Sequence, residues 1–178
     1  MRLNVRLVAL LVVTYLSRAS RADVVVRFDP PTSIVSVGDT VHIDLVADFP
    51  EPVLGWGLDL DNSNTFVAAL ASMPTISAPW TAAFTADGDG LGAVAFPAPV
   101  SGAGVVLAEL TFHASEVGIS QLSVHATSGD FTEGFAGYPS GFLQFTSEFG
   151  VIEVIPEPAT AILLGLGLTT LRRRNPIM

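Results

Sequence analysis

The stretch TVHIDLV at residues 40–46 decides the fold class of this chain. In an extended conformation its side chains fall on two opposite sides: Val41, Ile43 and Leu45 against His42, Asp44 and Val46. Alternation with a period of two is typical of a β-strand that has one buried face and one solvated face. Similar alternation recurs at residues 54–61 (LGWGLDLD), 108–113 (AELTFH) and 122–126 (LSVHA).

Turn-forming residues separate these stretches. Gly, Asp, Asn and Ser gather at residues 37–39, 61–64, 87–90 and 101–104, and these residue types favour tight turns. Between residues 23 and 155 the sequence shows no long amphipathic helical pattern, no internal repeat and no domain linker. The sequence therefore predicts an all-β fold, a single β-sandwich of about nine or ten short strands.

The basic residues are concentrated at the two ends of the chain. The 178 residues include no cysteine and no lysine, and all eight basic residues are arginine. Between residues 23 and 155, Arg27 stands alone against sixteen acids. Such an acidic body repels phosphate backbones, so the sequence predicts no nucleic-acid binding. Without lysine or cysteine, the chain has no P-loop, Schiff base, disulfide framework or cysteine nucleophile.

The N-terminal 22 residues have the pattern of a secretory signal peptide. Two arginines precede a short apolar run at residues 7–13 (LVALLVV), and the sequence SRA at residues 20–22 offers a small-x-small cleavage site. We expect cleavage between Ala22 and Asp23, with the SRA at residues 17–19 as an alternative site. An uncleaved anchor is the other interpretation, although the apolar run is short for a spanning helix of about 20 residues.

The C-terminal tail, residues 155–178, has three consecutive features. Pro156, Glu157 and Pro158 interrupt the preceding strand, since proline cannot continue a β-ladder. An uncharged run follows at residues 159–171 (ATAILLGLGLTTL), where we expect a transmembrane helix. The cluster Arg172, Arg173 and Arg174 then favours the cytoplasmic side, which leaves the folded domain outside the inner membrane.

This order of features resembles the PEP-CTERM sorting signal of exopolysaccharide-producing Gram-negative bacteria. The resemblance implies that an exosortase, a membrane protease-transpeptidase, recognises the Pro-Glu-Pro motif and removes the tail. It also implies an inner-membrane intermediate, followed by release to the cell surface or the extracellular matrix. The alternative is an ordinary membrane anchor, but 13 residues span only about 20 Å of a ~30 Å hydrocarbon core.

A second resemblance concerns the body of the chain, residues 23–154. Four short stretches are similar to strands of cohesin-like domains: 36–43 (SVGDTVHI), 56–61 (WGLDLD), 104–112 (GVVLAELTF) and 117–120 (VGIS). The resemblance implies a nine-stranded jelly-roll sandwich. Cohesins of cellulosomes bind dockerin modules, whereas exported PEP-CTERM proteins carry such domains with no dockerin partner known, so the resemblance implies the fold and not the partner.

Candidate metal ligands are few. The three histidines, His42, His113 and His125, fall on the polar sides of their strands, where solvated surface residues are expected, and no HExxH spacing accompanies them. Two clusters contain oxygen-bearing residues that suit calcium as well as tight turns: Asp59, Asp61, Asn62 and Asn64, and Asp87 with Asp89. Neither cluster has the bidentate glutamate of an EF-hand loop. We therefore expect no resident metal, with calcium as the alternative.

The Gly-rich segment at residues 129–145 (GDFTEGFAGYPSGFLQF) carries five aromatic residues. These rings, like Trp80, either close the end of the sandwich as core or contact a ligand such as a matrix polysaccharide or a surface protein. The candidate ligand contacts are Trp80, Phe135 and Tyr138.

No catalytic arrangement stands out in the sequence. There is no GxSxG motif and no recognisable Ser-His-Asp grouping. The sequence therefore predicts a non-enzymatic structural or adhesion protein, with a carbohydrate- or protein-binding module as the alternative.

Overall fold

The computed structural model describes residues 23–83 and 90–157. The predicted signal peptide, the turn containing Asp87 and Asp89, Pro158, the predicted membrane segment at 159–171 and the arginine cluster lie outside the described residues. Within the described ranges there is no helix of the length and hydropathy needed to cross a bilayer.

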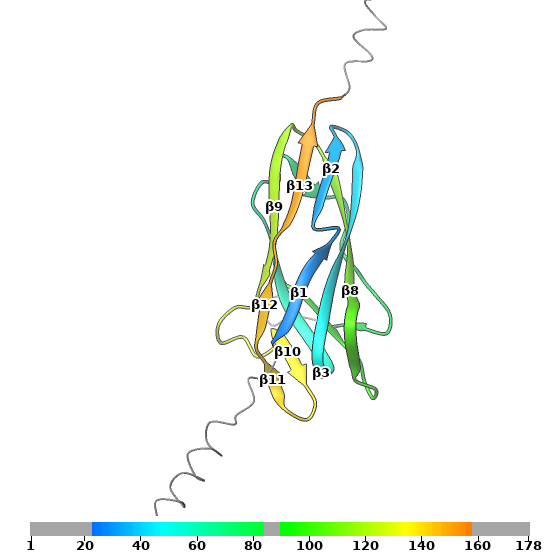
Figure 1. Cartoon of the computed structure of the whole chain (residues 1–178), viewed down its shortest axis with the longest axis vertical. Coiled ribbons are helices and arrows are strands. Elements are labelled where there is room, and N and C mark those ends of the chain that lie inside the picture. Colours follow the sequence, from blue (N-terminus) through cyan, green and yellow to red (C-terminus); the bar gives the residue numbers. More distant parts are fainter. Residues whose placement is uncertain (1–22, 84–89, 158–178) are drawn as a thin grey trace, which may run out of the picture.

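The described residues form an elongated all-β sandwich, as predicted (Figure 1). Thirteen strands are present in this part of the chain, more than the predicted nine or ten, because five of them are only two or three residues long. The strands are β1 (Val24–Asp29), β2 (Thr32–Ser36), β3 (Thr40–Asn62), β4 (Ala68–Leu70), β5 (Thr75–Ile76), β6 (Thr81–Ala83), β7 (Leu91–Val94), β8 (Val100–Ala114), β9 (Gly118–His125), β10 (Gly134–Gly137), β11 (Gly141–Leu143), β12 (Phe145–Ser147) and β13 (Gly150–Ile155).

The long strand β3 takes part in both sheets of the sandwich. Its first half pairs antiparallel with β1 and β8, so that Ile43 lies opposite Leu110. Its second half pairs with β7 and β10, so that Trp56 lies between Ala93 and Phe135. Near its end β3 pairs with β9, which continues through β13 to the edge strand β2. The single strand β3 thus belongs to both sheets of the sandwich.

The core is apolar and follows most of the predicted alternation, but Val46 departs from it. Val46 was expected on the polar face of its strand, but only 4% of it is exposed. The pairing of β3 with β8 shifts register between Leu45 and Val46, and such a bulge changes which side the next residue faces. Other large buried side chains include Phe28, Ile43, Leu58, Leu107 and Phe112.

The two ends of the sandwich differ in what they present. Figure 1 shows β13 ending at one end of the long axis, whereas β10 and β11 lie at the opposite end. At the first end, Ile155 is still paired with Ser36, and its carbonyl oxygen accepts a hydrogen bond from the Val37 amide at 3.1 Å. The chain therefore leaves the folded body at Pro156, far from the β10–β11 hairpin.

Candidate functional site

Two rows of mostly small residues line the outer face of β10, β3 and β7. The cross-strand neighbours Phe135, Trp56 and Ala93 are 0%, 3% and 1% exposed and face the core. Because side chains alternate along a strand, the residues on either side of them belong to the outer face. These outer residues are Ala136, Gly55 and Val94 in one row, and Gly134, Gly57 and Gly92 in the next.

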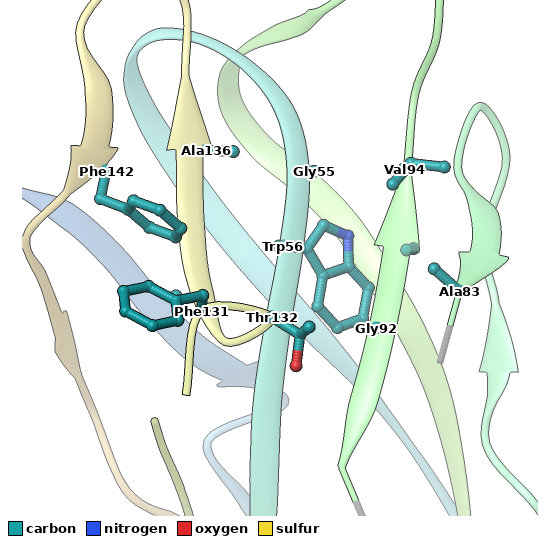
Figure 2. Close-up of a pocket in the computed structure, with 11 residues that line it drawn as sticks. Gly55, Trp56, Ala83, Gly92, Val94, Phe131, Thr132, Ala136 and Phe142 are labelled. Atoms are coloured by element: carbon teal, nitrogen blue, oxygen red, sulfur yellow. The ribbon is translucent and has the colours of Figure 1, made fainter. Parts of the chain in front are cut away.

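Large side chains border this face and form a pocket of about 240 Å³. Phe131 and Phe142 line one side and are 85% and 57% exposed, and Val94 and Ala83 line the opposite side. Figure 2 shows the two phenylalanine rings beside β10 and β11, across β3 from Val94 and Ala83. The missing side chains at Gly55, Gly92 and Gly134 leave backbone as the floor between these walls.

The loop that carries Phe131 is held close to β3 by hydrogen bonds through Thr127. Glu133 in this loop is 4% exposed, and its Oε2 accepts a hydrogen bond from the Thr127 amide. The Thr127 hydroxyl donates to Asp59 Oδ2 at 2.9 Å, which ties the start of the same loop to β3. At Gly57, a Cβ atom would lie 2.2 Å from the Thr132 carbonyl oxygen, so the loop backbone reaches the strand only because residue 57 is glycine.

A second interaction turns Phe131 outward. Asp130 Oδ1 accepts hydrogen bonds from the Thr132 amide at 2.7 Å and from the Thr132 hydroxyl at 2.6 Å. This is the local side-chain-to-backbone bond by which Asp stabilises turns. It fixes the backbone on both sides of Phe131 while the ring itself remains in solvent.

The chemistry of the pocket suits an apolar group. Thr132 is the one residue with a polar aliphatic side chain among those that line it, and its hydroxyl is already bonded to Asp130. A volume of about 240 Å³ is smaller than the roughly 300–1,000 Å³ typical of small-molecule sites. The pocket therefore has the size and lining to receive one large apolar side chain.

Of the three candidate ligand contacts predicted from the sequence, two are buried and one is exposed. Trp80 and Phe135 are 6% and 0% exposed, so both rings pack in the core, which is the first of the two interpretations given for them from the sequence. Phe49 packs against both rings, with centroids 6.0 Å from Trp80 and 5.8 Å from Phe135. Tyr138 is 58% exposed, but it does not line the pocket.

The pocket residues Phe131 and Phe142 belong to the aromatic segment noted in the sequence, but neither was singled out there. Phe142 borders the pocket because it lies opposite Ala136 in the β10–β11 ladder. That cross-strand register, and the turn at Asp130, are not visible in a period-two pattern. The buried Glu133 also carried no sequence pattern that marked it.

The three histidines do not converge. His42 on β3 contacts the Thr111 hydroxyl through Nδ1 at 3.1 Å, and His113 lies on the neighbouring strand β8. His125 lies on β9 between two carboxylates, with Asp59 Oδ2 at 3.4 Å and Asp61 Oδ2 at 3.2 Å. Within residues 23–83 and 90–157, no group of three or more His, Cys, Asp or Glu side chains is arranged to hold a metal ion.

The oxygen-rich cluster at the end of β3 closes a turn. Asn62 Oδ1 accepts hydrogen bonds from the Asn64 amide at 3.1 Å and from the Ser120 hydroxyl. Asn64 Oδ1 accepts one from the Phe66 amide at 3.2 Å. The amide oxygens that a calcium site would need are thus engaged within the chain, and the carboxylates of Asp59 and Asp61 face His125.

The residues of the predicted processing sites flank the sandwich. Asp23 is exposed and directly precedes β1, and Pro156 and Glu157 are exposed directly after β13. The remaining residues of both predicted signals lie outside the described ranges.

Solved cohesin structures superpose on this sandwich at low sequence identity. The third ScaB cohesin of R. flavefaciens, solved with a group 1 dockerin, matches at a TM-score of 0.57 with 13% identity, over 78% of this chain and 99% of that chain. A non-cellulosomal cohesin from Archaeoglobus fulgidus matches at 0.58 with 12% identity, over 80% and 98%. The fold is that of the cohesins.

A third cohesin structure agrees with this assignment. Coh-OlpC from Clostridium thermocellum, solved in complex with Doc435, matches at a TM-score of 0.54 with 14% identity, over 76% of this chain and 94% of that chain. No protein-family model and no curated protein matches the sequence. The cohesin fold is thus established from the structure, and the binding properties of this chain rest on its own surface.

Proposed function

We propose that this chain is an exported, non-catalytic surface module that binds a protein partner. The observation that carries the proposal is the apolar pocket between Phe131 and Phe142 on one side and Val94 and Ala83 on the other. Exposed large apolar side chains around a pocket are typical of protein interaction sites. The cohesin structures solved with dockerins support a protein as the partner class.

The charge of the chain specifies the partner further. Arg27, the one basic residue between 23 and 155, donates to Asp48 Oδ2 at 2.7 Å and is thereby paired. The acidic residues of the body outnumber it sixteen to one. Complementary charge speeds association and selects partners. The partner segment we propose therefore has a large apolar side chain flanked by Lys or Arg.

A carbohydrate fits the pocket less well. Sugar rings stack on aromatic side chains, and Phe131 and Phe142 are exposed enough for that contact. Their hydroxyl groups also need hydrogen-bond partners, since desolvated polar groups without partners are costly. Thr132 is the one hydroxyl-bearing residue of the lining, and it donates its hydroxyl hydrogen to Asp130 Oδ1.

The proposed location follows from the terminal sequences. A signal peptide at residues 1–22 would export the chain, and the tail at 155–178 would hold it in the inner membrane until an exosortase-type enzyme acts at Pro156-Glu157-Pro158. The exposure of Pro156 and Glu157, directly beyond the last paired residue, supports access by such an enzyme. The product would then reside at the cell surface or in the extracellular matrix.

The proposed pocket is tested by filling it. A peptide library is displayed against the full chain in lipid nanodiscs, and selected peptides are measured by titration against the Ala136→Leu variant. Ala136 lies on the half-buried floor of the pocket, so the added side chain should occupy the space of the anchor. We expect selected peptides to carry one aromatic or large aliphatic residue next to Lys or Arg, and to bind this variant at least tenfold more weakly.

Two exposed phenylalanines provide a matched comparison for the same assay. Phe142 and Phe149 are 57% and 59% exposed, but only Phe142 lines the pocket. Phe142→Ala should weaken binding, whereas Phe149→Ala should leave it unchanged. Selected peptides that bind both variants equally well would contradict the pocket as the site. Binding of a glycan array instead, lost in Phe142→Ala, would favour the carbohydrate alternative.

The proposed sorting is tested by the mass of the mature protein. In cells that contain an exosortase, we expect surface-recovered protein to lack residues 1–22 and the arginine cluster at 172–174. Replacement of Glu157 by Ala should leave the unprocessed chain in the inner membrane, because the motif that the enzyme reads is changed. Surface protein that still carries Arg172 to Met178 would contradict this part of the proposal.

A further inference from the structure

A group of exposed aliphatic side chains lies at the end of the sandwich where the chain leaves β13. Ile34 and Ile119 are each 62% exposed, Val117 is 55% exposed and Ile155 is 38% exposed. We call these four residues the exit patch. On the outer face of a sandwich, polar side chains are the expected occupants, so the exit patch is an exception that needs an explanation.

The strand register places these residues on one surface. Glu153 is the cross-strand partner of Ile34 on β2 and of Ile119 on β9. Ile152 and Val154 are 0% and 1% exposed and face the core, so Glu153 and Ile155 face outward by alternation. Ile34 and Ile119 thus flank β13 on the same outer face.

An aromatic ring extends the apolar surface at this end. Phe66 is 76% exposed and precedes Val67, whose side chain lies against Gly118: a Cβ atom at position 118 would be 2.8 Å from Val67 Cγ2. The carbonyl oxygen of Val67 also accepts a hydrogen bond from the Ser115 amide at 2.8 Å. Phe66 therefore belongs to the rim formed by the turn that contains Val117.

The length of chain beyond β13 limits how far this end can be from a membrane. Ile155 is the last paired residue, and the predicted membrane segment begins at residue 159, four positions later. Four residues reach at most about 14 Å. The headgroup region on one side of a bilayer is roughly 5–8 Å thick. Once residue 159 enters the hydrocarbon, the end of the sandwich must lie at or close to the headgroups.

We propose that, while the tail is in the membrane, the sandwich docks on the lipid surface through the exit patch. The inference rests on the proposed membrane tail and adds a second, separate contact between the folded domain and the bilayer. Large aliphatic side chains and an aromatic ring are the groups that partition into the headgroup–acyl boundary. This end faces away from the β10–β11 hairpin (Figure 1), so the pocket remains open to a partner from outside.

The contact is apolar and not electrostatic. The charged side chains at this end are acidic: Glu116 precedes Val117, Glu153 lies between Ile34 and Ile119, and Glu157 follows Ile155. The one basic residue described, Arg27, is paired with Asp48. Docking should therefore be strongest on zwitterionic lipid and weaker when anionic lipid is added.

The absence of cysteine from the chain permits a site-specific test. Gln121 is exposed on β9, two residues from Ile119, and Gln121→Cys gives a single attachment point for a fluorophore. The labelled full chain is reconstituted in phosphatidylcholine vesicles that contain a headgroup-level nitroxide lipid. We expect quenching at least twice that of a label at Phe142→Cys, which lies on β11 at the opposite end.

Variants of the exit patch separate docking from simple tethering. Ile34→Glu and Ile119→Glu, each combined with the label at position 121, should lower the quenching at least twofold, whereas Phe149→Glu should not. Quenching that is strong but unchanged in both variants would mean that the short tether alone holds the domain near the bilayer, and would overturn docking. Quenching that appears only when the processing enzyme is co-reconstituted would also overturn it, in favour of a protein contact.

Flotation with the vesicles distinguishes this inference from the proposed tail. A chain that floats with the lipid but shows no quenching at position 121 contradicts docking alone. A chain that does not float contradicts both the membrane tail and the docking that depends on it. Peptide binding at the pocket is measured independently of either result.

Discussion

Replacement of Phe135 by alanine is expected to lower the free energy of unfolding by about 3–5 kcal/mol, the range for deletion of a buried aromatic side chain. Phe135 is 0% exposed, and its ring lies 5.8 Å from Phe49 and 5.4 Å from Phe145, measured between centroids. Removal of the ring leaves a cavity between these two neighbours. Urea unfolding of the full chain in nanodiscs, followed by intrinsic tryptophan fluorescence, measures the change.

The neighbouring strand supplies the control for this prediction. Phe142→Ala removes the same ring from β11, but that ring is 57% exposed, so the loss of stability should stay below about 1 kcal/mol. The two variants should therefore show opposite patterns: Phe135→Ala lowers stability, and Phe142→Ala lowers peptide binding. Equal stability of the two variants would contradict the assignment of Phe135 to the core.

The fold could be predicted because burial imposes a period of two along each strand. In residues 108–113, the predicted apolar positions Ala108, Leu110 and Phe112 are all 0% exposed. The absence of cysteine and the turn residues between the strands were consistent with one sandwich that folds without disulfide bonds. The prediction was wrong at Val46, because the bulge there depends on the pairing of β3 with β8, which lies outside any local pattern.

The binding site could be predicted only as a region. The aromatic, Gly-rich segment was noted, but the sequence does not distinguish an exposed phenylalanine from a buried one. Phe135 and Phe142 both follow a glycine, yet one faces the core and the other the solvent. Their roles are decided by which residue lies opposite each of them: Trp56 for Phe135 and Ala136 for Phe142. This strand pairing is part of the tertiary structure, so it cannot be predicted from the local sequence pattern.

Gly57 should be the position at which a single added carbon has the largest effect on the pocket. A Cβ atom there would lie 2.2 Å from the Thr132 carbonyl oxygen and 3.1 Å from Glu133 Cα. Both of these are backbone atoms, which cannot rotate away as the end of a side chain can. We expect Gly57→Ala to lower the free energy of unfolding by about 1–3 kcal/mol, the usual cost of overpacking, and to displace the loop that carries Phe131.

Gly55, two residues earlier on the same outer face, is the matched control. A Cβ atom at position 55 would lie 3.2 Å from the Ala93 carbonyl oxygen and 3.3 Å from Val94 Cγ1, and Val94 is 44% exposed and free to adjust. Gly55→Ala should therefore change stability by less than about 1 kcal/mol. Its effect on peptide binding should also be smaller than that of Gly57→Ala. A larger effect of Gly55→Ala than of Gly57→Ala would mean that the loop does not rest on Gly57. The position of Phe131 would then not depend on this contact.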